Sequence, residues 1–153
     1  MNKIVEIARR EIGVTEAPPN SNQTKYGAWF GMQNVAWCGI FVSWVYDQAK
    51  FNLGNMGYRR GFAGCQTAYN LFLSKNEITT HPQPGDIVLF DWNADHRFDH
   101  TGIFIKDNGD NKTFTSVEGN TSYKNDSNGG AVMERIRNYS TATFVHPKVL
   151  DKK

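Results

Sequence analysis

Residues 37–44 have the sequence Trp37-Cys38-Gly39-Ile40-Phe41-Val42-Ser43-Trp44, and this stretch decides how the first half of the chain folds. With the residues that follow, it places apolar side chains on one stripe at helical spacing: Cys38, Phe41, Val42, Val45 and Ala49. Asp47 and Lys50 lie off that stripe. The pattern predicts a helix over residues 37–50, packed against a core, with Cys38 in its first turn.

Shorter helical stretches are predicted on either side, over residues 2–12, 25–30 and 64–73. The first is a surface helix whose apolar residues recur at helical spacing, and Gly13 is a natural cap for its C-terminus. Pro18-Pro19 lie between this helix and the central one, so most of that segment is predicted to be loop.

The second half of the chain changes to strand-like patterns rich in β-forming residues. Strands are predicted over residues 86–90, 100–105, 113–118, 131–137 and 143–146. Pro84-Gly85 introduces the first of them, and Asn108-Gly109 is a hairpin signal. Helices followed by antiparallel strands indicate an α+β fold with the helices on one face of the sheet. We expect a single domain over residues 1–150 and a charged tail over 151–153.

Composition excludes several classes of protein. The chain has 153 residues, of which 39% are hydrophobic, and its formal charge is +2. No cluster of basic residues exceeds the pair Arg59–Arg60, so no nucleic-acid partner is expected. No apolar run approaches the ~20 residues that span a bilayer, and none resembles a signal peptide. We therefore expect a monomer made in the cytoplasm, without membrane insertion.

Cys38 is the candidate nucleophile. A thiol attacks as thiolate, and a free cysteine with a pKa near ~8.5 is largely protonated at neutral pH. The positive end of a helix dipole and a neighbouring imidazolium both lower that pKa, and Cys38 is placed to use the first. Cys65 is interpreted as a small buried hydrophobe. The two cysteines could form one disulfide but not a disulfide framework.

His100 is the best candidate for the base among four histidines. It opens a predicted strand, and Gly102 leaves room beside it for another group. Glu118 and Asn120, at the end of the next strand, would lie beside His100 and could orient its ring. His81 and His146 each precede proline, and His96 lies in a polar loop. Spacing alone also fits a core cysteine and an ordinary strand-end histidine.

Four segments together resemble the CHAP family of cysteine- and histidine-dependent amidohydrolases and peptidases. They are the stretch around Cys38, Pro84-Gly85-Asp86-Ile87-Val88, Asp99-His100-Thr101-Gly102-Ile103 and Glu118-Gly119-Asn120-Thr121, in the family's order. The resemblance covers residues 1–147, and residues 22–31 also resemble phage lysins. It implies a papain-like fold, with Cys38 as nucleophile, His100 as base, Glu118 as orienter and Asn120 as a further polar position.

The resemblance also implies a reaction. Cys38 attacks an amide carbonyl of bacterial peptidoglycan, His100 protonates the leaving amine, and water releases the acyl group. The chemistry needs no cofactor, and the protein would act at the cell wall. The backbone N–H of Cys38 is expected in the oxyanion hole. Gln33 and Asn34 are nearby candidates for its side-chain donor.

A calcium loop is predicted directly before His100. Oxygen ligands occur at the spacing of the first part of an EF-hand loop: Asp91, Asn93, Asp95, the Arg97 carbonyl and Asp99. His96 replaces the usual glycine, and Gly102 stands where a bidentate glutamate is expected. The alternative interpretation is a polar loop satisfied by its own Asx turns.

Three functions fit these features. The leading hypothesis is an N-acetylmuramoyl-L-alanine amidase or an endopeptidase, as the module of a phage endolysin. Trp37, beside the nucleophile, and Trp92, near His100, are expected to line its substrate groove. A second hypothesis is an antibacterial effector amidase with an immunity partner. A third, from a different class, is a catalytically silent wall- or calcium-binding module.

Overall fold

The computed structural model describes residues 2–93, 95–126 and 128–151. Four α-helices come first: α1 (Lys3–Arg10), α2 (Lys25–Phe30), α3 (Cys38–Gln48) and α4 (Cys65–Ser74). Six strands follow: β1 (Ile78–Thr79), β2 (Ile87–Phe90), β3 (His100–Asp107), β4 (Thr113–Thr121), β5 (Ala131–Asn138) and β6 (Ala142–Val145). Two 3-10 helices, η1 (Tyr139–Thr141) and η2 (Lys148–Asp151), flank β6. The predicted α+β fold is confirmed.

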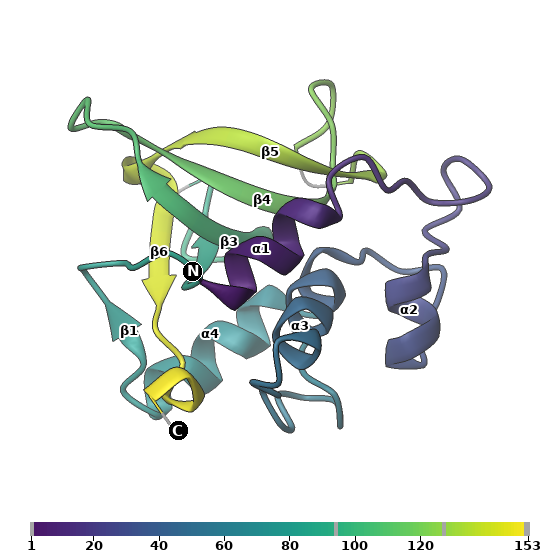
Figure 1. The fold of residues 1–153 in the computed structure, drawn as a ribbon, viewed down its shortest axis with the longest axis horizontal. Coiled ribbons are helices and arrows are strands. Elements are labelled where there is room, and N and C mark those ends of the chain that lie inside the picture. Colours follow the sequence, from purple (N-terminus) through teal and green to yellow (C-terminus); the bar gives the residue numbers. More distant parts are fainter. Residues whose placement is uncertain (1, 94, 127, 152–153) are drawn as a thin grey trace.

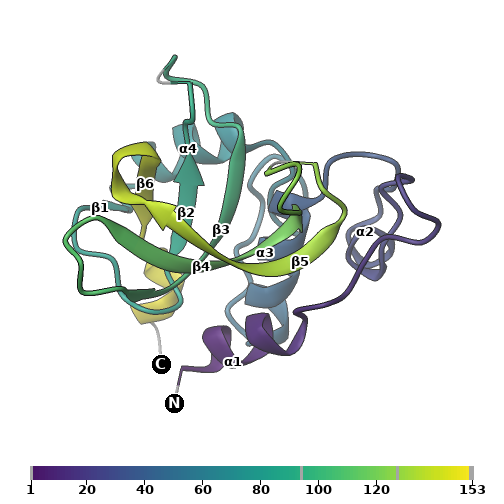
Figure 2. The ribbon, with the colours of Figure 1, turned by 90° about the horizontal axis from the view of Figure 1, so that it is seen from above.

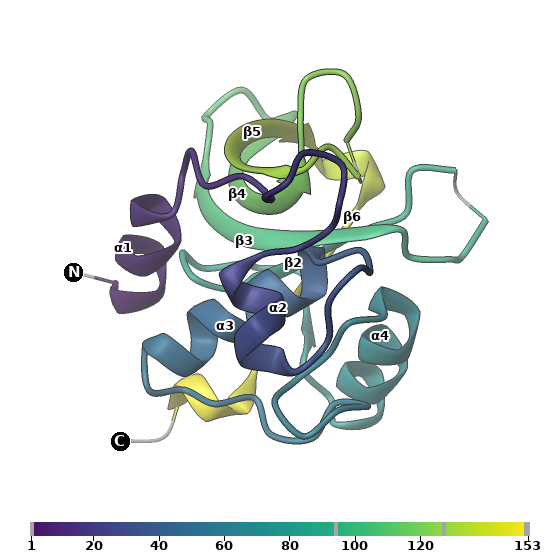
Figure 3. The ribbon, with the colours of Figure 1, turned by 90° about the vertical axis from the view of Figure 1, so that its right-hand side faces the viewer.

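The strands form one antiparallel sheet in the order β1-β6-β2-β3-β4-β5. Helices α1, α3 and α4 lie together on one side of it (Figure 1). Figure 2 shows the strong twist of β4 and β5 across the molecule, and Figure 3 shows them curling at one edge of the sheet. This curl brings side chains from β3, β4 and β5 together on the face away from the helices.

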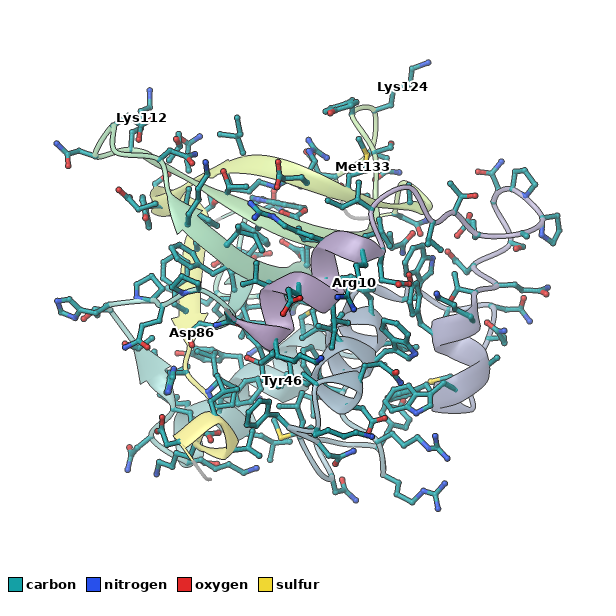
Figure 4. All side chains as sticks on the ribbon, viewed as in Figure 1. Arg10, Tyr46, Asp86, Lys112, Lys124 and Met133 are labelled. Atoms are coloured by element: carbon teal, nitrogen blue, oxygen red, sulfur yellow. The ribbon has the colours of Figure 1, made fainter. Side chains whose placement is uncertain are left out.

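Helix α3 is buried nearly all round, not along one stripe as predicted. It packs on β3 and β4 and also contacts α1 and α2, so its polar Ser43 is buried as well. At its C-terminal end, the Tyr46 hydroxyl donates to the Gly85 carbonyl oxygen at 2.6 Å, in the turn before β2. Tyr46 and Asp86 mark this region in Figure 4. Cys38, in the first turn, is one of the buried residues of this helix.

Both faces of β2 are buried. Ile87 and Leu89 belong to the core beneath the helices, while Val88 and Phe90 belong to a second, aromatic cluster on the opposite face. The remaining members of that cluster are Phe104, Phe114 and Phe144. Burial of both faces explains why β2 is a continuous apolar run rather than an alternating one.

The structure differs from the sequence prediction in two further places. β1 was not predicted, because a two-residue strand leaves no periodicity; Ile78 pairs with Val145 of β6. Asp151, expected in a charged tail, instead ends η2 and accepts a hydrogen bond from His146. Residues 152–153 of the expected tail lie outside the described residues. Within the described ranges, no helix has the length and apolar character to cross a membrane.

Candidate active site

Cys38 is the first residue of α3. Its N-cap, Trp37, makes no side-chain capping bond, so the N–H groups of the first turn remain available, and the backbone of Gly39 donates toward the sulfur. The side chain is 3% exposed. The positive end of the helix dipole therefore acts on a sulfur that is largely shielded from water.

His100 is the first residue of β3 and is fully buried. Its Nε2–H donates to Oε1 of Glu118 at 3.0 Å. The rings of Phe90 and Trp92 stack against it with centroid distances of 5.8 and 5.3 Å. Among the described residues, Nδ1 of His100 is the buried side-chain atom that has no hydrogen-bond partner. The ring is thus fixed in place with one nitrogen left free.

Glu118 of β4 occupies the space left by Gly102, as the sequence suggested. A Cβ atom on Gly102 would lie 2.6 Å from Cγ of Glu118. Arg137 of β5 donates to this carboxylate twice, from Nε at 2.9 Å and from Nη2 at 2.5 Å, and the Ser116 hydroxyl donates to it as well. Burial opposes ionisation, but these bonds and His100 lower the pKa of Glu118 from 4.5 to about 2.

Cys38 and His100 shift each other's pKa. A hydrogen bond from Cys65 lowers the pKa of the Cys38 thiol most; burial opposes this, and His100 lowers the pKa further, to well below 9.0. Burial disfavours imidazolium, but Cys38 and then Glu118 raise the pKa of His100 from 6.5 to about 9. These shifts favour the thiolate of Cys38 and the imidazolium of His100. Nδ1 of His100 has no hydrogen-bond partner among the described residues, although Cys38 is close enough to shift its pKa.

Asn120 lies near this group but contacts other residues. Its side-chain oxygen accepts from the N–H of Gly130 at 3.1 Å, and its Nδ2 donates to Asn128 at 3.1 Å. Of the two predicted orienting residues, Glu118 is the one bonded to His100. Asn120 instead holds the loop between β4 and β5.

Two predicted substrate contacts are corrected. Trp37 is 1% exposed, stacks on Tyr26, and donates its Nε1–H to Glu16 at 3.0 Å, so it presents no surface to a groove. Gln33 uses both ends of its amide on the backbone of Thr24, which removes it as an oxyanion donor. Trp92 is partly buried and stacks on His100.

Three carboxylates of the predicted calcium loop converge. Asp91, Asp95 and Asp99 each offer an oxygen, and these oxygens lie within 4.8 Å of one another. The Asp91 carboxylate also accepts backbone N–H bonds from Asp95 at 3.3 Å and from His96 at 2.9 Å. Asn93 and Arg97 are exposed members of the same loop, and Ala94 lies outside the described residues. A set of carboxylate oxygens is chemically suited to a hard cation such as Ca²⁺.

Sequence reasoning missed three residues of the site: Ser116, Arg137 and Cys65. Ser116 lies two residues before Glu118 on the same strand, so the period of a strand would have placed both on one face. Arg137 belongs to a predicted strand of this antiparallel region, where a buried carboxylate calls for a cation. Cys65 lies at the start of a predicted helix, as Cys38 does.

The fold and the site define a papain-like α+β protein in which a helix-borne thiol meets an imidazole and a carboxylate on a sheet. The family model of the CHAP domain matches residues 29–120, which is more than half of the chain. The chain belongs to the CHAP domain family.

Comparison with solved structures agrees with this assignment. The chain is similar to the structure titled "Crystal structure of a wild type endolysin LysIME-EF1", with a TM-score of 0.51 and 15% sequence identity. The match covers 94% of this chain and 62% of that one, so this chain spans less than two thirds of the endolysin's length. No curated protein matches the sequence. The family assignment and the fold therefore agree.

Proposed function

We propose that this protein hydrolyses an amide bond of bacterial peptidoglycan through a cysteine mechanism and acts at the cell wall. The observation that carries the proposal is the state of His100: one nitrogen is held by an ionised Glu118, and the other is free. The Cys38 thiol, at a helix N-terminus, lies beside the ring and raises the pKa of His100. This arrangement has the parts of an activated cysteine nucleophile.

The chemistry follows from the charges of the site. The Cys38 thiolate attacks the amide carbonyl carbon, and the helix N-terminus stabilises the oxyanion that forms. As the carbon–nitrogen bond breaks, the His100 imidazolium gives its proton to the leaving amine, and a thioester remains on Cys38. Neutral His100 then takes a proton from water, which attacks the thioester and releases the acid. Glu118 keeps the ring oriented throughout.

Two amide bonds of peptidoglycan fit this chemistry. One joins the stem peptide to the lactyl group of N-acetylmuramic acid, and the other lies within or between stem peptides. The endolysin named above supports a lysin-type enzyme of either specificity. Mass spectrometry of fragments released from purified walls distinguishes them: an amidase frees whole stem peptides, and an endopeptidase opens cross-links. Release of glycan fragments alone would contradict both.

The direct test is Cys38→Ala, measured as the clearing of a suspension of purified walls. We expect clearing by the parent protein and none by the variant, with unchanged near-UV circular dichroism to show that the core is intact. His81→Ala is the matched control, because this histidine is exposed and, among the described residues, its ring bonds to its neighbour Thr80 and its backbone N–H to Thr79. Clearing by Cys38→Ala would refute the thiol mechanism.

We also propose that Asp91, Asp95 and Asp99 hold a calcium ion. The support is the convergence of their oxygens within 4.8 Å. Asp99 directly precedes His100, so a bound ion would neutralise the repulsion between the carboxylates and brace the segment that enters β3. Calorimetric titration of chelator-treated protein with Ca²⁺ tests this, and Asp95→Asn should weaken the binding. Absence of both heat and a change in melting temperature would contradict it.

A further inference from the structure

A second thiol lies against the nucleophile. The Sγ atom of Cys65 is 4.0 Å from that of Cys38, both side chains are buried, and neither is in a disulfide. Cys65 is the first residue of α4, as Cys38 is the first residue of α3. The N-termini of two helices therefore meet at one pair of sulfur atoms.

The chain is built so that these helix ends can meet. Gly39 has no side chain, and a Cβ atom there would lie 2.8 Å from the ring of Phe62 and 3.0 Å from the carbonyl oxygen of Ala63. The Ser43 hydroxyl accepts from the N–H of Phe62 at 3.0 Å and donates to the Gly39 carbonyl at 2.9 Å. These contacts fasten the segment before α4 onto α3 and bring Cys65 to the nucleophile.

The first turns of α4 also hold the segment that leads to the base. The Gln66 side-chain oxygen accepts from the N–H of Phe98 at 3.1 Å, and Tyr69 stacks on the ring of Phe98 at 4.4 Å. Phe98 lies two residues before His100. Cys65 thus belongs to a helix, α4, that is held on one side to α3, which carries Cys38, and on the other to the segment before His100.

The charges around the two sulfur atoms decide which one keeps its proton. His100 lies beside Cys38 and favours its thiolate. The bond to Cys38, burial, and the charges of Cys38 and Asp99 together raise the pKa of Cys65 well above 9.0. His100 beside Cys38, and the N–H of Gly39 directed at its sulfur, therefore favour Cys38 as the acceptor of this contact and Cys65 as the S–H donor.

We propose that Cys65 is a positioning residue, which donates its S–H to the Cys38 thiolate and keeps the nucleophile ionised in a site almost closed to water. Cys38 is 3% exposed, so its sulfur receives little solvation and a protein donor takes the place of the missing water. The proposal rests on the function proposed above for Cys38, but the ionisation that it concerns can be measured without any hydrolysis.

The test follows the alkylation of Cys38 by iodoacetamide as a function of pH, with the modified cysteine identified in peptides by mass spectrometry. In Cys65→Ala, which removes the donor, we expect the midpoint for Cys38 to rise by about one pH unit or more. Cys65→Ser keeps a hydroxyl donor and should retain most of the parent's midpoint. Cys38→Ala reports the alkylation of Cys65 by itself.

Wall clearing supplies a second readout. The acid limb of the pH profile should move upward in Cys65→Ala and be largely restored in Cys65→Ser, with KM little changed, because the donor acts on the nucleophile and not on the substrate. A purely structural role for Cys65 would lower the melting temperature without moving this limb. If Cys65→Ala does not fold, Cys65→Val fills the space without a donor and permits the same comparison.

The results separate this inference from the proposed function. An unchanged midpoint for Cys38 in folded Cys65→Ala or Cys65→Val overturns the role of Cys65, even if the parent clears walls normally. Conversely, a low midpoint in the parent, with the expected rise in the variant but no wall clearing by either protein, supports the S–H donor and overturns the proposed function.

Discussion

His100 and His146 are both bonded to carboxylates, yet their surroundings differ. His146 uses both ring nitrogens: Nδ1–H donates to Asp86 at 2.6 Å and Nε2–H donates to Asp151 at 2.9 Å, and its side chain is 27% exposed. Fully buried His100 uses Nε2 on Glu118 and leaves Nδ1 free. A ring with both nitrogens bonded joins two parts of a fold, whereas a free nitrogen beside a thiol is available to transfer protons.

The carboxylates differ as well. Glu118 is fully buried and forms an ion pair with Arg137, so its negative charge is balanced even when His100 is neutral. Asp86 accepts from the backbone of Gln83 at 2.8 Å and has His146 as its charged partner. Glu118 can therefore stay ionised while His100 changes its protonation, whereas Asp86 and His146 depend on each other.

The first prediction compares the loss of the His100 ring with the loss of the His146 ring. His100→Ala should lower the rate of wall clearing by at least about 10³-fold, since it removes the proton donor to the leaving amine. His146→Ala should leave the rate close to that of the parent. Turbidity measurements on purified walls at equal protein concentration check both variants, and a comparable loss in the two would contradict the distinction.

The next effect concerns the partner of Glu118. Arg137→Met should cost about 3–5 kcal/mol of unfolding free energy, because it leaves a buried carboxylate without its cation. The matched control is Arg135→Met on the same strand, whose side chain bonds to Thr121, Ser122 and Asp126 rather than to Glu118. Urea denaturation measures both, and equal losses would show that the pair with Glu118 has no special weight.

The third prediction concerns the alkaline limb of activity. His100 must be protonated to assist the leaving amine, so wall clearing should fall as the pH rises through an apparent pKa of about 9. The raised pKa also links protonation to folding: its stabilising contribution is full below 6.5 and is lost as the pH rises from 6.5 through about 9. Initial rates and melting temperatures over this range test both statements. An alkaline limb near 6.5 would contradict the ion pair.

The last prediction concerns the small contribution of His146 to the free energy of unfolding. Burial opposes the protonation of His146, but hydrogen bonds and charges from Asp151 and Asp86 raise its pKa above 6.5. Burial also raises the pKa of Asp86 above 3.8. The stabilisation is thus full below pH 6.5 and lost as the pH rises through the raised value. His146→Gln should lose about 1 kcal/mol at the acid end and little at alkaline pH. A loss independent of pH in urea denaturation would indicate packing instead.

Much of the fold was predictable because its signals are local. The four helices and five of the strands lie within a few residues of their predicted positions, since amphipathic spacing and turn residues act over short distances. The complete burial of α3 was not predictable, because it depends on how β3, β4, α1 and α2 surround it. No pattern within residues 37–50 reveals that arrangement.

Within the site, Cys38, His100 and Glu118 were predicted from motifs, but their supporting residues were not. Arg137 pairs across the sheet with Phe114, four residues from Glu118, so the contact depends on a long side chain and on the curl of the sheet. Cys65 reaches Cys38 through packing at Gly39 and Ser43, where sequence spacing carries no information. These contacts belong to tertiary structure alone.

The bond between Arg137 and Glu118 also limits which part of this chain can be exchanged in a chimaera. The match to the family model ends at residue 120, but Arg137 lies on β5. A transplant of residues 29–120 alone would remove the counter-charge of Glu118 and expose β2 and β4 as open sheet edges. The smallest unit that keeps this buried ion pair and the sheet intact therefore extends at least to the end of β6.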